Sequence, residues 1–121
     1  MGYIGRFEDK QKQTSSTSTI TFVSQKVQRN QQVVVKFASV ADYTTANKKL
    51  ILGIRSAGNV DQYLQVNNPL ATYRAEYSLT LNGEITLIEG ESFIGIVESP
   101  TGSDVLYFSV FGDRYTIKEA K

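Results

Sequence analysis

Residues 77–87 read YSLTLNGEITL, a run in which apolar side chains alternate with polar ones on either side of Asn82-Gly83. A period of two puts the two sets on opposite faces of a β-strand, whereas an amphipathic helix needs a period near about 3.6. Asn-Gly is typical of a tight turn. We therefore predict a hairpin, with a three-residue loop at residues 81–83. That register pairs Leu79 with Ile85 and keeps each strand's apolar set on one face.

The last part of the chain predicts a second hairpin. Gly112-Asp113 suits a two-residue turn, and this register pairs Val110 with Tyr115 and Phe108 with Ile117 on a common face. Both hairpins favour antiparallel pairing of neighbouring strands.

The alternation extends upstream to residue 18, and no other stretch carries a convincing helical stripe; at most, residues 41–47 have room for one helical turn. About eight short strands without intervening helices predict an all-β fold, an antiparallel β-sandwich. The long connection between Phe37 and Leu50 suits a crossover between sheets, so we expect a jelly-roll-like arrangement. The side chains expected to face inward are Phe22, Val35, Leu52, Ile54, Leu79, Leu87, Ile96, Phe108 and Val110.

Residues 1–17 differ from the rest in being polar, charged and rich in Ser and Thr. We interpret them as an extended N-terminal arm, followed by a sandwich domain at residues 18–121. Tyr3, Ile4 and Phe7 are apolar side chains on this hydrophilic segment, and we assign them as docking anchors for assembly. Removing the arm is expected to spare the fold; the alternative is a passive chain end.

Composition excludes most familiar catalysis. The 121 residues include no His and no Cys, which removes the commonest general base and the soft metal ligands, so we expect no enzyme activity, cofactor or metal. With 13 basic and 12 acidic residues, no overall field draws the chain to nucleic acid or a membrane. The N-terminus has no apolar signal region, so synthesis in a cytoplasm is expected.

Three groups of side chains have both a functional and a structural interpretation. Glu84, Glu89 and Glu91 are candidate cation ligands, but their spacing fits turn carboxylates better. A nucleic-acid patch would need the basic side chains to gather, and we interpret them as dispersed surface charge. Those side chains are Lys48, Lys49, Arg55, Arg74 and Arg114.

The third group consists of tyrosines beside the Asn- and Gln-rich segment 59–68. Aromatic faces stack on sugar rings, so these tyrosines are a possible glycan-binding platform. The alternative is that they straddle a core or a subunit interface with their hydroxyls in water. The four are Tyr43, Tyr63, Tyr73 and Tyr77.

The opening Met1-Gly2-Tyr3-Ile4-Gly5-Arg6, the Ser/Thr-rich arm and the all-β body together resemble the small virion proteins of tailed bacteriophages. This resemblance implies a non-enzymatic capsid decoration or related virion component. It also implies a homo-oligomer, with a trimer favoured, whose arm binds a major capsid or other virion protein. The alternatives are a carbohydrate-binding β-sandwich and a tail or tail-fibre adaptor; a carboxylate-dependent hydrolase is the least favoured.

Overall fold

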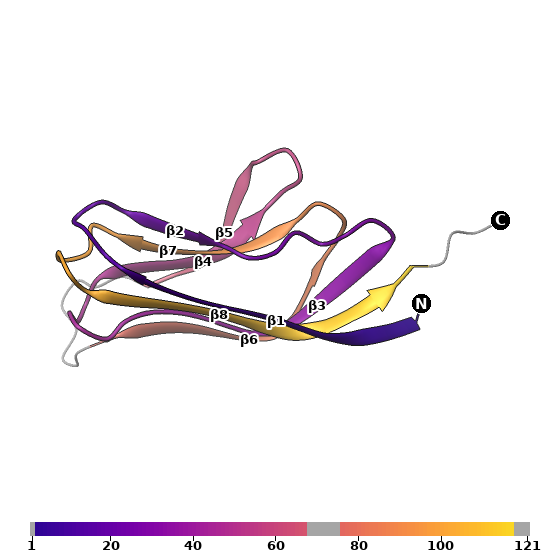
Figure 1. Ribbon diagram of the computed structural model, residues 1–121, viewed down its shortest axis with the longest axis horizontal. Coiled ribbons are helices and arrows are strands. Elements are labelled where there is room, and N and C mark those ends of the chain that lie inside the picture. The colour runs from indigo at the N-terminus through magenta and orange to yellow at the C-terminus, as the bar shows by residue number, and fades with distance from the viewer. Residues whose placement is uncertain (1, 68–75, 118–121) are drawn as a thin grey trace.

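Two four-stranded antiparallel sheets pack face to face in the computed structural model (Figure 1). The structure describes residues 2–67 and 76–117. Within them the strands are β1 (Gly2–Thr14), β2 (Ile20–Val23), β3 (Gln31–Asp42), β4 (Lys49–Arg55), β5 (Asp61–Val66), β6 (Ser78–Leu87), β7 (Ser92–Glu98) and β8 (Val105–Thr116).

The strand order is that of a jelly roll. Sheet A has the order β1-β8-β3-β6 and sheet B the order β2-β7-β4-β5, so nearly every connection crosses from one sheet to the other. Such crossings build two Greek keys from eight strands. The predicted fold class is confirmed.

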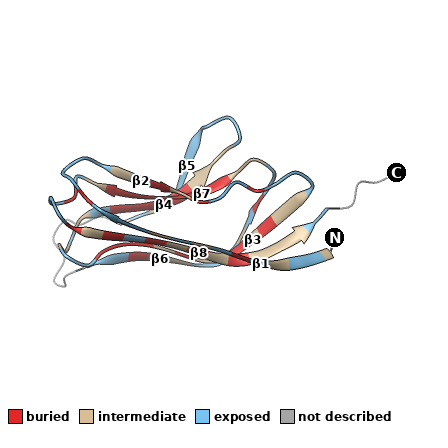
Figure 2. Ribbon diagram, in the orientation of Figure 1, coloured by how far each residue is buried: buried red, intermediate tan, exposed pale blue. Residues whose placement is uncertain are grey.

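The core lies between the sheets, and its centre is an aromatic stack. Phe22 from sheet B lies parallel to Phe108 from sheet A, with ring centroids 5.6 Å apart. A Cβ atom added to Gly95 would lie 2.5 Å from Cδ1 of Phe108, so the glycine leaves the space that the ring occupies. Figure 2 shows the buried residues concentrated where the sheets face each other.

Most of the predicted inward-facing side chains belong to this core, and Ile54 packs against it in a partly buried position. Ile96 was assigned to the wrong face. It lies with Ile51 and Ile94 in a separate buried cluster, on the opposite side of β7 from Phe93 and Val97. The inward position between Phe93 and Val97 is occupied by Gly95, which no hydrophobic pattern marks.

Both predicted hairpins are wrong, because each turn signal lies inside one long, bent strand. β6 runs through Asn82-Gly83 and β8 runs through Gly112-Asp113, each pairing with β3 along its length. β3 has a register shift between Val35 and Phe37 at the same level of the sheet. Gly83 has a φ of 146°, and a Cβ at Gly112 would lie 2.1 Å from the Val34 carbonyl oxygen. These features bend three adjacent strands together.

The predicted N-terminal arm is also wrong, because residues 2–14 form β1, the edge strand of sheet A. β1 pairs with β8 from Gly2↔Thr116 to Thr14↔Val105. Phe7 is 1% exposed and belongs to the chain's own core, so it is not a docking anchor. Of the thirteen residues of β1, Phe7 is the buried one, which explains why the strand's sequence is so hydrophilic.

We predict that truncation to a chain beginning at Ser18 abolishes the native fold, because it removes a whole strand and Phe7 with it. The single substitution Phe7→Ala should lower the free energy of unfolding by about 3–5 kcal/mol. Ile4→Ala, at an exposed position of the same strand, is the control and should change stability little. Urea denaturation measures both; equal effects of the two substitutions would contradict the placement of β1.

A second prediction concerns the space at Gly95. Gly95→Ala should destabilise the fold, because the new methyl group would overlap the Phe108 ring, and overpacking of a core costs about 1–3 kcal/mol. Adding Phe108→Leu should recover part of that loss, although the same substitution alone destabilises the parent chain. Strictly additive effects in this double-mutant cycle would show that the two residues do not share the space.

Candidate functional site

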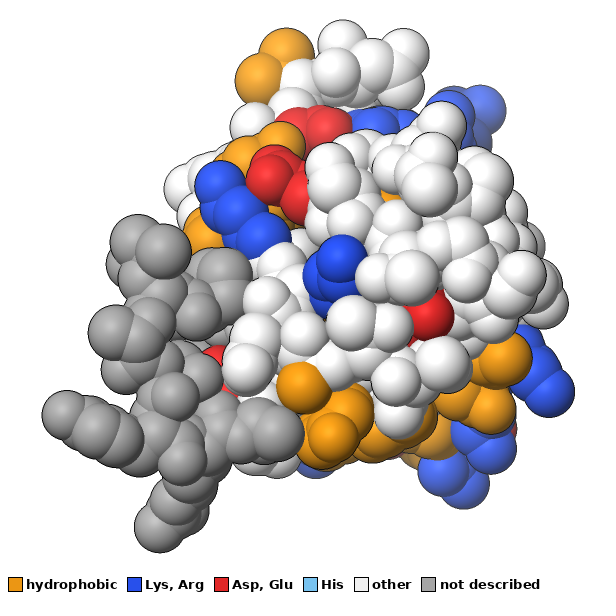
Figure 3. Space-filling view, turned by 90° about the vertical axis from the view of Figure 1, so that its left-hand side faces the viewer, with side chains coloured by type: hydrophobic (Ala, Val, Ile, Leu, Met, Phe, Trp, Pro, Cys, Tyr) orange, Lys and Arg blue, Asp and Glu red, His pale blue; other side chains and the backbone are white. Residues whose placement is uncertain are grey.

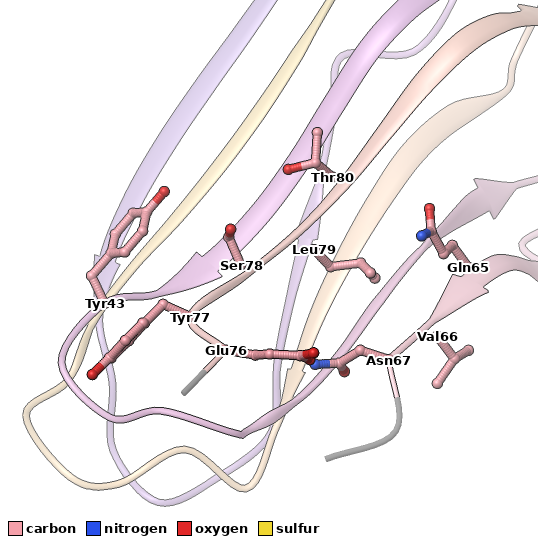
Figure 4. A pocket seen from close by; sticks show the side chains of 9 residues that line it. All are labelled: Tyr43, Gln65, Val66, Asn67, Glu76, Tyr77, Ser78, Leu79 and Thr80. Atoms are coloured by element: carbon pink, nitrogen blue, oxygen red, sulfur yellow. The ribbon is translucent and has the colours of Figure 1, made fainter. Parts of the chain in front are cut away.

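The sandwich is open along one side, where edge strands β5 and β6 belong to different sheets. A pocket of about 660 Å³ lies between them. Figure 4 shows Tyr43 and Tyr77 at one end of the pocket, Leu79 near its middle, and β5 at the opposite side. Its lining residues are Tyr43, Gln65, Val66, Asn67, Glu76, Tyr77, Ser78, Leu79 and Thr80.

Hydrogen bonds fix both sides of this opening. Asn67 accepts a hydrogen bond from the backbone N–H of Leu50 and donates one of 3.2 Å to the carbonyl of Lys48, which ties the end of β5 to β4. On the other side, the N–H of Asp42 donates to the carbonyl of Tyr77 at 2.8 Å. The pocket walls are therefore held by the sandwich itself.

The turn of the β4–β5 hairpin projects away from the body of the sandwich (Figure 1). Its strand β5 has a register shift opposite Leu52–Gly53 and leaves Tyr63 and Leu64 exposed. Beside its turn, Arg55 forms two hydrogen bonds with Asp61, at 2.7 and 3.1 Å. These bonds lower the pKa of the Asp61 carboxyl. The hairpin adds exposed apolar side chains to the open side.

The outer face of sheet A carries aromatic pairs that the chain's own cations cover. Tyr107 pairs with Tyr43, and Phe111 pairs with Phe37, at centroid distances of 5.7 and 5.8 Å. The ammonium group of Lys12 lies over Tyr107 and that of Lys10 over Phe111. Figure 3 shows hydrophobic side chains along the lower border of the end view, which sheet A forms. These cation–π contacts cover the face only in part, because Tyr43 and Tyr107 are exposed.

The tyrosines predicted as a glycan platform do not come together as a set. Tyr43 and Tyr77 both line the pocket. Tyr63 is exposed on β5 outside the pocket lining, and Tyr73 lies outside the described residues. Of the assigned docking anchors, Tyr3 packs edge-on against Tyr115 and Ile4 is exposed on β1. Their role in docking stays a prediction.

Several of the charged groups weighed in the sequence have local partners, while Arg74 lies outside the described residues. Glu89 and Glu91 accept hydrogen bonds from the backbone N–H groups of Asn30 and Ile88, as turn carboxylates do. Lys49 pairs with Glu98, and the Arg114 guanidinium lies over the ring of Phe7. In the part of the chain that the structure describes, no three Asp or Glu side chains gather as a candidate metal site. None of its helices is long and apolar enough to cross a membrane.

Sequence reasoning missed the residues at the free edge of β6. Leu81 and Ile85 pack against the core but remain partly buried, and within residues 2–67 and 76–117 β6 is an edge strand of sheet A. Their alternation was visible in the sequence. The predicted hairpin paired Ile85 with Leu79, and this hid the fact that both lie along one edge.

Comparisons with known proteins identify no family: no family model and no curated protein matches the chain. Among solved structures, the crystal structure of Drosophila NLP-core is similar over 93% of this chain and 100% of that chain, with a TM-score of 0.47 and 15% identity. Its description concerns pentamer formation and histone binding.

The resemblance to bacteriophage virion proteins is not supported. The comparisons found no phage similarity, and the prediction of a capsid decoration, related virion or tail-adaptor protein is wrong. The trimer and the capsid partner have no support either. A location in a virion followed from the resemblance alone and stays a prediction.

We predict that Asn67→Ala loosens the β5 side of the pocket. The substitution removes two hydrogen bonds to β4, and each is worth about 0.5–1.5 kcal/mol to the free energy of unfolding. Gln65→Ala, which removes another amide side chain from the same lining, is the matched control and should cost less. Chemical denaturation compares them, and an unchanged midpoint for Asn67→Ala would refute this role.

Proposed function

We propose that this chain is a non-catalytic subunit that associates with copies of itself through the free edge of β6. The observation that carries the proposal is the contrast among the strands at the sheet edges. An edge strand presents unpaired backbone N–H and C=O groups, and natural proteins protect such edges with charge, proline, shortness or bending.

Three of the four edges have such protection. β1 has five charged residues among its thirteen, and β2 is four residues long. β5 belongs to a hairpin that projects from the sheet. β6 is ten residues long, contains no proline, and has Glu84 as its single charge. Its bend at Asn82-Gly83 coincides with the register shift in β3, and β6 stays paired with β3 on both sides of the bend.

The surroundings of β6 favour a second copy of the same strand as its partner. Leu81 and Ile85 are partly buried core residues that a further strand in sheet A would cover. Tyr77, 39% exposed, extends the apolar surface at the start of β6. Pairing two β6 edges about a two-fold axis would extend sheet A across both copies and use up both free edges. This arrangement is a closed dimer.

A non-catalytic role is part of the same proposal. The chain contains no His and no Cys, so a nucleophile or metal site would have to be built from other groups. The pocket between β5 and β6 has one carboxylate, Glu76, among its lining residues. General acid–base chemistry of the kind glycosidases use needs a pair.

The test compares one lysine on each of two edges. Thr80→Lys introduces a charge at an exposed position of β6, and two copies would bring like charges together across the new pairing. Gln13→Lys makes an equivalent change at an exposed position of β1 and is the matched control. In sedimentation velocity, the parent chain and Gln13→Lys should form dimers, while Thr80→Lys should sediment as a monomer with an unchanged Tm.

Two results would contradict the proposal. The first is a parent chain that stays monomeric up to its solubility limit. The second is equal dimerisation of the two variants. The second result would place the interface elsewhere on the molecule, with self-association itself retained.

A further inference from the structure

Two carboxyl groups are buried together where β3 ends and β8 begins. Asp42 is the last residue of β3 and Asp104 immediately precedes β8, and each is 1% exposed. Among the described residues, the Oδ2 atoms of both belong to the few buried side-chain oxygens without a hydrogen-bond partner. Unpartnered buried carboxylate oxygens are costly, so this pair needs a physical explanation.

The other oxygen of each group is held in place. Oδ1 of Asp42 accepts hydrogen bonds from the N–H groups of Thr44 and Thr45, at 3.1 and 3.0 Å. The Thr45 hydroxyl donates to Oδ1 of Asp104 at 3.0 Å. Because Thr45 binds both carboxyl groups, it holds them side by side.

Three loops between strands surround the two carboxyl groups. The N–H of Asp104 donates to Ser15 Oγ, which in turn donates to the carbonyl of Thr101. The charged group that acts on the pair from nearby is Lys48, which favours the ionised form of Asp104 and also donates to the Ser99 carbonyl. The pair therefore joins the β1–β2, β3–β4 and β7–β8 connections at one end of the sandwich.

We propose that Asp42 and Asp104 share one proton between their Oδ2 atoms, and that loss of this proton to solvent loosens residues 43–48. With the proton present, one Oδ2 donates to the other and neither oxygen is left unpaired. Without it, two buried negative charges face each other. Residues 43–48 include Tyr43 of the pocket and both threonines that hold Asp42.

The pKa values of the two carboxyl groups shift in opposite directions. Burial and the neighbouring Asp104 raise the pKa of Asp42, whereas the interaction with Asp42 and the hydrogen bond from Thr45 lower the pKa of Asp104. The stabilisation from Asp42 is present below its unfolded pKa and is lost as the pH rises through its folded pKa. The stabilisation from Asp104 is lost as the pH falls through the lowered pKa of Asp104. The pair contributes most between these two pKa values.

Asp42→Asn tests the shared proton directly, because the amide is nearly the same shape and donates without titrating. The Tm of Asp42→Asn should exceed that of the parent chain at pH 8, and the difference should vanish or reverse at pH 4. Asp61→Asn is the control of opposite sign: losing the Arg55 partner should lower the Tm at pH 8 more than at pH 4. Differential scanning calorimetry at both pH values measures these shifts.

A second measurement uses the unmodified chain and does not depend on a variant that folds. Carboxyl carbon NMR should show one of the two aspartates titrating above, and the other below, the range of the exposed aspartates. The proposal fails if both groups titrate normally, or if the Tm gain of Asp42→Asn is the same at pH 4 and pH 8. It also fails if calcium or magnesium chloride raises the Tm of the parent chain but not of Asp42→Asn, because the pair would then bind a cation.

Discussion

The contact between Phe108 and Gly95 sets the distance between the sheets at the centre of the sandwich. Phe108 belongs to β8, an inner strand of sheet A, and Gly95 to β7, an inner strand of sheet B. The Phe108 ring occupies the volume that any side chain at residue 95 would need. The same ring stacks on Phe22. The remaining buried side chains pack around this stack, and at the β6 edge Leu81 and Ile85 are only partly buried.

The proposed pairing of two copies therefore depends on the edge strands. On the β1 side, the Asp9 carboxylate accepts a hydrogen bond from the N–H of Gln25, and the side-chain amide of Gln11 donates to the carbonyl of Val23. These bonds join sheet A to the segment around the end of β2. On the other side, β5 and β6 diverge around the pocket and leave Leu81 half-covered. Partner binding at β6 would cover an edge that the described residues leave unpaired.

The sequence was sufficient for the fold class because alternation alone requires buried strand faces. The expected crossover between Phe37 and Leu50 is present, but it is short, because β3 continues to Asp42 and only residues 43–48 connect it to β4. Strand identities were harder to predict. Asn82-Gly83 has the composition of a turn, yet here it lies within a strand whose bend matches the register shift in β3. The β1 strand escaped detection because an edge strand with one buried side chain has no apolar alternation. The Asp42–Asp104 pair joins residues 62 positions apart, and no local pattern reports such a contact.

Backbone hydrogen exchange at increasing protein concentration measures the occupancy of the β6 edge most directly. If two copies pair through this edge, amides of β6 that face outward should exchange more slowly as the concentration rises. Amides of β1, at the opposite edge of the same sheet, should exchange at a constant rate. Concentration-independent exchange along the whole of β6 would contradict self-association through this strand.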